Sequence, residues 1–343
     1  MNRTFLPQTA SSLYSLCTSA RNRAYDLIPS LCRKAPRRVI SIGGIRAGGT
    51  GKTPCALLTG KKLMEMGFNV AFLSRGYGRK ERQPVIAEPR KPQPWELIGD
   101  EPALLHRNLP QSWLGIGSKR VTVAEKLGHL VPENTIFVLD DGFQHRRIRR
   151  DLDIVCLNSD LFSDRMIPMG YMRESLNSLC RADLALVIGS FDETVEDLNK
   201  TADRLRDRFR NLTVLILKQR ALCWVNCATG LESETLPFTR PSLICGIARP
   251  HRFIDLIKFM HIEISMAYCF KDHYVFQMSD LIKKRILYSE GIITTEKDYM
   301  RLCSLDLDKA VQESMWYLKM ELDFTDQESS EAFFSTLQRL KHN

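Results

Sequence analysis

The stretch ISIGGIRAGGTGKT, residues Ile40–Thr53, decides how this chain folds. A short apolar strand runs into a glycine-rich turn that ends in Gly-Lys-Thr, and a helical pattern follows. Glycines let the backbone wrap around an anion with its N–H groups pointing inward, while Lys52 adds a positive charge and Thr53 a hydroxyl for Mg²⁺. The pattern predicts a cradle for the phosphates of a nucleoside triphosphate.

The cradle departs from the usual pattern in one place. Arg46 stands where the first glycine usually stands, and Gly48 and Gly49 supply flexibility instead. The alternative is a plain glycine turn between a strand and a helix. We assign nucleotide binding to the whole loop, which comprises Arg46, Ala47, Gly48, Gly49, Thr50, Gly51, Lys52 and Thr53.

The chain is long enough for two domains and is strongly basic. It has 343 residues, with 49 Lys and Arg against 40 Asp and Glu, which is a formal net charge of +9. This excess indicates an anionic partner, which could be nucleic acid, anionic lipid or a phosphorylated substrate. Ten cysteines without a C-x-x-C pair favour reduced thiols in a cytosolic compartment. No apolar run of about 20 residues and no signal peptide is evident.

Apolar strands alternate with helical stretches after Pro36. Runs such as Thr135–Leu139 are apolar throughout, as in strands buried on both faces. This alternation predicts an α/β fold with a parallel sheet and helices on both faces. We divide the chain into an N-terminal segment, 1–35, a main domain, 36–220, and a smaller domain, 221–343, although no obvious linker marks the last boundary.

The N-terminal segment has a helical pattern of its own. Apolar residues recur at helical spacing from Leu13 to Leu31, and Arg21 and Arg23 lie within the same segment. One interpretation is a basic amphipathic helix on the surface of an anionic membrane. The other is a helix that packs on its own domain with its arginines in water.

Two pairs of acidic residues are candidates for chemistry. Asp140 and Asp141 directly follow a buried strand, at the carboxyl end where open α/β sheets bind ligands, and could complete a Mg²⁺ site. Asp100 could accept a proton from a substrate hydroxyl, and Glu101 could support the metal. Either pair could instead cap a helix.

Three further segments remain ambiguous on their own. Asp272-His273 is an acid beside a histidine, which is usually structural. The loop Ser74–Gly78 could be a plain turn or could lie over a substrate. The basic run Arg146–Arg150 could contact nucleic acid, but it lacks interleaved aromatic residues, so a solvated face or a lipid phosphate fits at least as well.

Several motifs together resemble one family, the tetraacyldisaccharide 4'-kinases of lipid A biosynthesis. They occur in the family's order between about residues 36 and 302, and that family does not keep the first glycine of the loop. The motifs are AGGTGKTP (Ala47–Pro54), LSRGYGRK (Leu73–Lys80), GDEP (Gly99–Pro102), LDDGFQHRRIRRDLDI (Leu139–Ile154), IPMGYMRE (Ile167–Glu174), GIARPHRF (Gly246–Phe253), FKDHY (Phe270–Tyr274) and TTEKD (Thr294–Asp298).

The resemblance implies a kinase that moves the γ-phosphoryl group of ATP to the 4'-hydroxyl of a tetraacylated glucosamine disaccharide 1-phosphate. It implies a P-loop NTPase-type α/β/α sandwich with a mostly parallel sheet plus a smaller α/β/α domain. The implied location is the cytoplasmic face of the bacterial inner membrane, peripheral or monotopic, with no nucleic acid and no obligate protein partner. Polar residues such as Gln8 and Ser15 dilute the N-terminal segment here, which favours a shallow interfacial helix over a spanning one.

The resemblance also implies roles for individual residues. Lys52 would hold the β- and γ-phosphates, and Asp100 would be the general base, paired with His273 from the second domain. The remaining implied assignments are Thr53, Glu101, Asp140 and Asp141 for Mg²⁺, Arg173 and Glu174 near the nucleotide, and Ser74, Tyr77 and Arg120 at the sugar or its 1-phosphate.

Two other function classes compete with this interpretation. One is a regulatory NTPase switch of the partitioning type, but Ala47 stands where that group has an additional lysine. The other is a nucleic-acid-binding NTPase that would use Arg146–Arg150. ATP consumption that depends on the lipid disaccharide separates the kinase from both.

Overall fold

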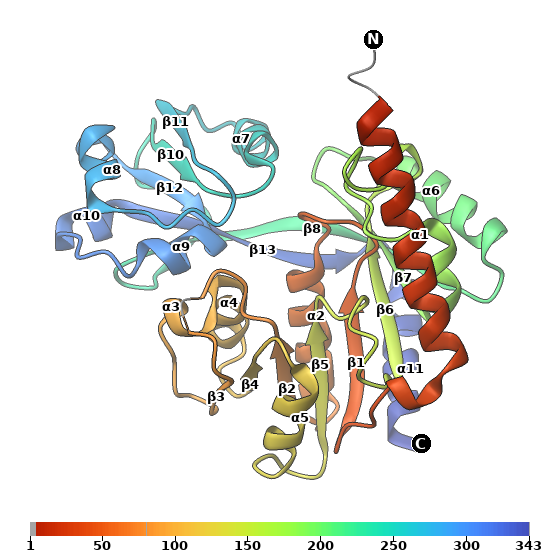
Figure 1. The fold of residues 1–343 in the computed structure, drawn as a ribbon. Coiled ribbons are helices and arrows are strands. Elements are labelled where there is room, and N and C mark those ends of the chain that lie inside the picture. The colour runs from red at the N-terminus through yellow and green to blue at the C-terminus, as the bar shows by residue number, and fades with distance from the viewer. Residues whose placement is uncertain (1–4, 80, 343) are drawn as a thin grey trace.

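The computed structural model describes residues 5–79 and 81–342, and one large sheet runs through them (Figure 1). The strand order is β11-β10-β12-β13-β8-β7-β6-β1-β5-β2-β4-β3, with β9 paired to β8 at the side. The strands are β1 (Arg38–Gly43), β2 (Asn69–Ser74), β3 (Val85–Ala87), β4 (Trp113–Ile116), β5 (Thr135–Asp140), β6 (Leu152–Leu157), β7 (Leu184–Gly189), β8 (Thr213–Asn226), β9 (Glu232–Ser233), β10 (Ser242–Cys245), β11 (Met266–Cys269), β12 (Ile292–Thr295) and β13 (Met315–Phe324).

Most neighbouring strands are parallel, which confirms the predicted mostly parallel sheet. The antiparallel pairs are β3 with β4, β8 with β9, and β8 with β13. The helices are α1 (Phe5–Leu27), α2 (Lys52–Glu65), α3 (Trp95–Ile98), α4 (Asp100–Asn108), α5 (Arg120–Gly128), α6 (Val195–Arg208), α7 (Pro250–Phe259), α8 (Met278–Lys283), α9 (Glu296–Leu302), α10 (Lys309–Ser314) and α11 (Gln327–His342).

Helices cover both faces of the main part of the sheet. Every residue of β5, β6 and β7 is buried, because each strand has a helix layer on either side. On one face α2, α4 and α11 pack around Ile40 and Ile42 of β1. On the other face α5 packs over β1, β2 and β5, while α6 packs over β6, β7 and β8. This arrangement is the predicted α/β/α sandwich.

The second part of the molecule is a continuation of the same sheet. β8 and β13 are long, and they carry the sheet from the main sandwich to β12, β10 and β11, as Figure 1 shows. The predicted boundary near residue 221 therefore falls inside β8. The chain also returns: α11 packs its Phe333 and Leu337 into the core around β1. The division into domains stays a prediction. The two parts share the strands β8 and β13, and α11 returns to the main sandwich.

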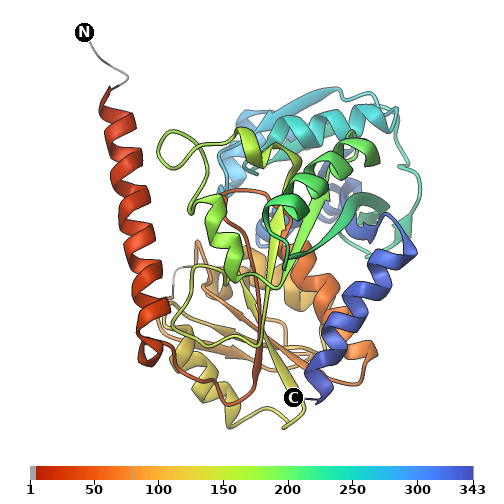
Figure 2. The same ribbon diagram turned by 90° about the vertical axis from the view of Figure 1, so that its right-hand side faces the viewer.

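The N-terminal helix α1 stands at the edge of the molecule, as Figure 2 shows. Leu13 and Leu16 are 62% and 67% exposed, so part of its apolar surface faces away from the body. Its other side makes polar contacts: Arg146 donates to the carbonyl of Asn22 at 2.8 Å and to Asp26 at 2.6 Å. In the described part of the chain no helix combines the length and apolar character needed to cross a bilayer. The helix therefore contacts the main sandwich, as one interpretation predicted, and also exposes apolar side chains, as the other required. Its contact with a membrane stays a prediction.

Candidate functional site

The glycine-rich loop joins β1 to α2 with the backbone shape that a phosphate cradle needs. Gly48 and Gly51 adopt positive φ values of 88° and 80°, where glycine carries no steric penalty. A Cβ on Gly51 would lie 2.7 Å from Cδ1 of Ile188 on β7, so the residue is restricted by packing as well as by conformation. The N-terminus of α2, which begins at Lys52, therefore points its free N–H groups into the loop.

Lys52 lies at the mouth of the loop. Its Nζ donates to the carbonyl of Gly48 at 3.3 Å and to the hydroxyl of Thr50 at 3.4 Å, and it lies 3.8 Å from Oδ1 of Asp141. These are long contacts to neutral oxygens and one carboxylate. The ammonium group is therefore held beside the cradle by weak partners that a phosphate, a stronger acceptor, can replace.

Asp140 ends β5 and has the most unusual environment in this region. Its side chain is buried, and neither carboxylate oxygen has a hydrogen-bond partner among the described residues. Burial raises the pKa of Asp140 to about 7, and the charges of Glu101 and Asp141 add to the rise. An orphaned buried carboxylate beside a phosphate cradle fits a Mg²⁺ ligand, because that ion takes one or two carboxylates plus phosphate oxygens.

Asp141 is engaged differently from its neighbour. Arg173 donates two hydrogen bonds to its carboxylate, at 2.8 Å to Oδ2 and 2.7 Å to Oδ1. Burial acts to raise the pKa of Asp141, but Arg173 and the charge of Lys52 lower it well below its usual range. Its φ of 50° lies in the left-handed region, which is rare for a residue with a side chain and is often found at functional sites. The two adjacent carboxylates thus differ sharply in proton affinity.

Asp100 and His273 meet although 173 positions separate them in the chain. Asp100 begins α4 and His273 lies in the turn after β11, and Oδ2 of the acid is 2.9 Å from Nδ1 of the imidazole. The Asp100 side chain is only 3% exposed. Burial acts to raise its pKa, but the hydrogen bond from His273 and the charge of Lys297 outweigh burial, so its pKa lies below the usual value. Asp100 is a buried carboxylate that stays ionised.

Glu101 lies between the Asp100–His273 pair and Asp140, the candidate Mg²⁺ ligand, in its electrostatic effects. Its charge contributes to the raised pKa of Asp140, so the two carboxylates are close enough to repel. Its Oε1 also accepts a hydrogen bond from Nζ of Lys297 at 3.0 Å. Glu101, the predicted metal support, is therefore paired with a lysine of the second part of the molecule, and its role toward Mg²⁺ stays a prediction.

Arg46, which replaces the usual first glycine, attaches the loop to the segment that follows β6. Its side chain is 3% exposed and pairs with Asp160 and, at 2.6 Å, with Asp164. Next to it, Ala47 donates its backbone N–H to the carbonyl of Tyr171 at 2.7 Å. The guanidinium thus ties the cradle to the segment that follows β6, and a direct contact of Arg46 with nucleotide stays a prediction.

Glu174 is buried in a polar network below the loop. Arg181 pairs with it at 2.8 Å, Gln144 donates to it at 2.9 Å, and Asn22 of α1 donates to it at 2.5 Å. Glu174 therefore links the N-terminal helix to the main sandwich. Its neighbour Arg173 is the residue of this pair that reaches Asp141.

The three predicted substrate residues lie in different environments. Tyr77 is 62% exposed and its ring lies 4.8 Å from the ring of His273, so it borders the Asp100 pair. Ser74 is buried at the end of β2. Arg120 is also buried. The charges of Asp141 and Asp140 act on it, so it lies near the two candidate Mg²⁺ ligands.

A basic cluster surrounds His145, which follows Asp140-Asp141 in the sequence. Burial, together with the positive charges around it, lowers the pKa of His145 to about 4. These charges are Arg120, Arg147, Arg150 and Arg75. The cluster offers positive potential to an anionic group on the same side of the sheet as the acidic residues.

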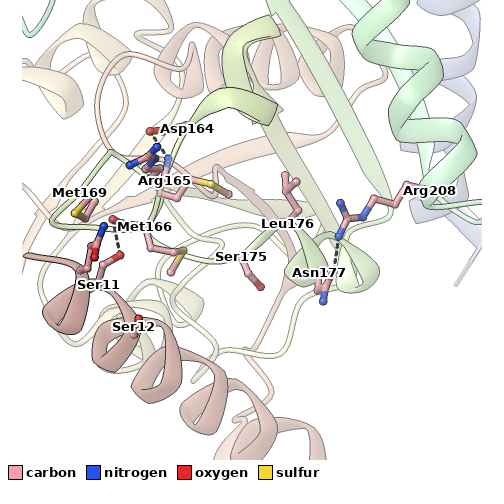
Figure 3. A pocket seen from close by; sticks show the side chains of 12 residues that line it. Ser11, Ser12, Asp164, Arg165, Met166, Met169, Ser175, Leu176, Asn177 and Arg208 are labelled. Atoms are coloured by element: carbon pink, nitrogen blue, oxygen red, sulfur yellow. Dashed lines mark hydrogen bonds between the residues drawn. The ribbon is translucent and has the colours of Figure 1, made fainter. Parts of the chain in front are cut away.

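A cavity of about 660 Å³ lies between α1 and the segment after β6, and Figure 3 shows its lining. Ser11 of α1 points across it and donates to the carbonyl of Met166 at 3.0 Å. Met166 and Met169 line the same wall, beside Asp164, the partner of Arg46. The N-terminal helix therefore lines one side of an open hollow beside Asp164, the partner of Arg46.

Sequence reasoning missed two charged residues at the site. Lys297 lies in the TTEKD motif and reaches Glu101 and His273, and Arg301, one turn later, is buried 3.7 Å from Oδ2 of Asp100. The available signal was the position of Lys297, which is the second residue after the apolar strand β12, at a strand end where functional groups collect. The carboxylate partners Glu101 and Asp100 lie about 200 residues earlier, which sequence spacing cannot reveal.

Comparison with known proteins gives a consistent family. The family profile described as tetraacyldisaccharide-1-P 4'-kinase, LpxK, matches residues 3–339. The tetraacyldisaccharide 4'-kinase of Cytophaga hutchinsonii is 32% identical over 327 residues, covering 93% of this chain and 91% of its own. That of Chlorobium phaeovibrioides is 34% identical over 328 residues, covering 90% of each. A crystal structure of LpxK from Aquifex aeolicus in complex with ATP superimposes with a TM-score of 0.77 at 26% identity, covering 97% of this chain and 98% of that one.

Proposed function

Because this chain belongs to the tetraacyldisaccharide-1-phosphate 4'-kinase family, we propose that its site transfers the γ-phosphoryl group of ATP to the 4'-hydroxyl of a tetraacylated glucosamine disaccharide 1-phosphate. One observation supports the mechanism most: Asp100 is a buried carboxylate hydrogen-bonded to His273, and the charge of its chain neighbour Glu101 acts on Asp140 beside the phosphate cradle. The group that would activate the acceptor and the groups that would bind the phosphates therefore act on one another electrostatically.

The donor side consists of the cradle and two oxygen ligands. Lys52 would release its weak contacts and pair with the β- and γ-phosphates, while the N–H groups at the start of α2 bind the phosphate oxygens. Thr53 and Asp140 would hold Mg²⁺. When bound, that ion supplies positive charge that offsets the charge on the phosphates. Arg173 keeps Asp141 ionised and in place beside them.

The acceptor side centres on Asp100. The 4'-hydroxyl oxygen forms a bond to the γ-phosphorus while the bond from that phosphorus to the β,γ-bridging oxygen breaks, and ADP leaves. The hydroxyl proton passes to the Asp100 carboxylate, which is ionised and shielded from bulk water. His273 holds that carboxylate through Oδ2, so its geometry is defined before the acceptor arrives.

Two surfaces fit a lipid that carries a phosphate. Of the basic cluster, Arg75, Arg120 and Arg147 suit the 1-phosphate, whereas Arg150 is already paired with Asp153 at 2.9 Å. The exposed apolar residues of α1 and the arginines nearby suit the surface of an anionic membrane, which is where an acylated disaccharide resides. We place the protein accordingly at the cytoplasmic face of the inner membrane.

The test is a phosphate-transfer assay on the full chain. We expect that ATP, Mg²⁺ and a tetraacyldisaccharide 1-phosphate in mixed micelles give a product with one added phosphate by mass spectrometry. An acceptor already phosphorylated at the 4' position is the matched control and should give no product. ATP consumption that is equal with and without the acceptor, and no phosphorylated lipid, would sink the proposal in favour of a regulatory NTPase.

A further inference from the structure

His273 reaches Asp100 from a turn that is itself held firmly. Its backbone N–H donates to the carbonyl of Gly246 at 3.1 Å, and its φ of 55° is left-handed. With Nδ1 at 2.9 Å from Asp100 and the Tyr77 ring against one side, the only ring nitrogen left to be explained is Nε2. The group that faces Nε2 determines which nitrogen carries the proton.

Two charged groups approach Nε2, and they differ in distance. Nζ of Lys297 lies 3.3 Å away, whereas the nearest oxygen of Asp272 lies 3.9 Å away, beyond hydrogen-bond range. An ammonium group has three donors and no acceptor. A hydrogen bond between Lys297 and Nε2 therefore requires Nε2 to offer its lone pair, which places the imidazole proton on Nδ1.

Lys297 is well placed to hold this contact. It lies in the first turn of α9, its side chain is 22% exposed, and a second donor of the same ammonium is taken by Oε1 of Glu101 at 3.0 Å. Two carboxylates lie beside the same nitrogen, Glu101 at 3.0 Å and Asp100 at 4.0 Å, and both favour the charged ammonium form. Nζ is therefore a donor toward Nε2.

We propose that Lys297 is a positioning residue that keeps Nε2 of His273 free of a proton and orients the ring, so that Nδ1–H of a neutral imidazole donates to Asp100. The opposite tautomer would turn a lone pair on Nδ1 toward a carboxylate oxygen, and that contact is repulsive. With the proton on Nδ1, Asp100 only accepts, and it remains free to take a proton from the acceptor. Lys297 does not touch substrate in this scheme and acts through His273.

The same lysine joins three segments that are far apart in the chain. It contacts Glu101 on α4 of the main sandwich and His273 in the turn after β11, while it belongs to α9. Its two partners can be contacted together only when the two parts of the sheet sit as they do here. This dependence makes Lys297 a link between the arrangement of the parts and the state of the base.

The first test is spectroscopic and needs no lipid substrate. Two-bond ¹H–¹⁵N correlations of the full chain, with His273→Gln identifying the signal, should show Nδ1 protonated and Nε2 bare near neutral pH. In Lys297→Met, a shape match without donors, we expect Nε2 to gain a proton while Nδ1 keeps its own, because Asp100 still accepts from Nδ1. Lys297→Arg, which keeps donors and has no acceptor, should retain the wild-type pattern. Lys309→Met, at a site where the side chain is 87% exposed, is the matched control.

The second test is kinetic and rests on the proposed function. Lys297→Met should lower kcat by roughly 10–100-fold, the usual cost of losing the partner that orients a functional histidine. The KM values for ATP and for the lipid should stay within about twofold, and Lys297→Arg should recover most of the rate. If no lipid is phosphorylated by the wild type, the function fails while the spectroscopic test still stands.

Three results would overturn the inference. The first is a neutral Nδ1–H tautomer that persists in Lys297→Met, which would leave Lys297 as a counter-ion of Glu101 alone. The second is a kcat of Lys297→Met equal to that of the wild type. The third covers a Lys297→Met protein that does not fold: Lys297→Arg then carries the test, and a protonated Nε2 in that variant contradicts the role of the donor.

Discussion

Asp100 is a carboxylate that the protein keeps charged in a nearly dry place. Its low pKa means that it does not need to lose a proton before it can act, which suits a base that receives one from a hydroxyl. The cost is a weak intrinsic basicity, so its contribution depends on position more than on proton affinity. Position is supplied by His273 and by the nearby Arg301.

We expect Asp100→Asn to lower kcat by about 10²–10⁴-fold, the range for a positioned base. The KM for ATP should change little, because the cradle is made by other residues. Steady-state kinetics with the lipid acceptor measure both values. Asp306→Asn, at an exposed acid, is the control. A kcat close to that of the wild type would assign Asp100 to capping of α4.

Asp140 offers a pH-dependent prediction at the same scale. Its pKa in the folded chain is about 7, above its ordinary 3.8, so the folded state holds a proton that the unfolded state has lost between these values. Stability therefore falls as the pH rises through this window and stays lower above about 7.

We expect Asp140→Asn, which mimics the protonated form, to stabilise the protein without nucleotide or metal at about pH 8 by roughly 4 kcal/mol, because its pKa of about 7 lies some three units above 3.8. The gain should vanish near pH 4, and kinase activity should be lost at every pH. Thermal melts with a chelator measure the first effect, and Asp323→Asn is an exposed control. A variant that is less stable than the wild type at pH 8 would contradict the burial argument.

Among the elements, α1 combines two surfaces that the sequence alone could not separate. Polar contacts through Asn22 and Asp26 attach it to the body, while Leu13 and Leu16 remain exposed. Apolar side chains held out in water on a helix with nearby arginines fit an interfacial position.

We expect the double variant Leu13→Ser, Leu16→Ser to lower the fraction bound to anionic vesicles by tenfold or more, since burying each leucine contributes about 1.5–3 kcal/mol. The melting temperature should not change, because both side chains are exposed in the folded protein. Leu130→Ser, at a 54% exposed leucine on another surface, controls for general loss of apolar area. Unchanged vesicle binding would place the membrane contact elsewhere.

Helix α9 carries a buried ion pair that supports the turn of His273. Asp298 and Arg301 pair with each other while being 0% and 1% exposed. Asp298 also accepts the N–H of Gly246, and Arg301 donates to the carbonyls of Gly246 and Tyr274. The pair therefore holds Tyr274, which follows His273, and Gly246, whose carbonyl accepts the His273 backbone N–H.

We expect Asp298→Ala to destabilise the protein by about 3–5 kcal/mol, because it leaves the Arg301 guanidinium buried without its partner. Urea unfolding measures the loss. The matched control is Glu313→Ala, whose exposed pairing with Lys309 should contribute less than about 1 kcal/mol. A loss for Asp298→Ala no larger than that of the control would show that water reaches Arg301.

The molecule as a whole is built as one sheet that the chain traverses twice. β8 leads out of the main sandwich, β13 leads back antiparallel to it, and α11 then packs beside β1 (Figure 1). The last residues of the chain thus complete the core around the first strand. Stability of the cradle depends on a segment nearly 300 residues away from it.

We expect Leu337→Ala, at a fully buried side chain of α11, to lower the free energy of unfolding by about 2–5 kcal/mol. ATP binding should be lost together with the core at lower urea concentrations than in the wild type. Leu231→Ala, at a 61% exposed leucine, is the control. If Leu337→Ala had no effect on the unfolding of the main sandwich, α11 would be an accessory to it.

Much of this architecture could be predicted. The apolar run before Gly43 and the run Thr135–Leu139 predicted buried parallel strands, and both are β-strands with no exposed apolar residue. The motifs predicted the family and the meeting of Asp100 with His273. The sequence did not predict the return of α11 or the shared strands, since no local pattern records which distant surface covers a helix.

The sequence by itself determined the cradle, because glycines at positive φ, a lysine and a helix start are local requirements that neighbouring residues satisfy. It also determined the family, because each motif is a short contiguous segment that can be recognised without the structure. Only the tertiary structure decided the state of each acid. Asp140 is left without partners, Asp141 is gripped by Arg173, and Asp100 faces His273 and Lys297. Charge and proton affinity depend on burial and on neighbours in space, and those neighbours come from segments that only folding brings together.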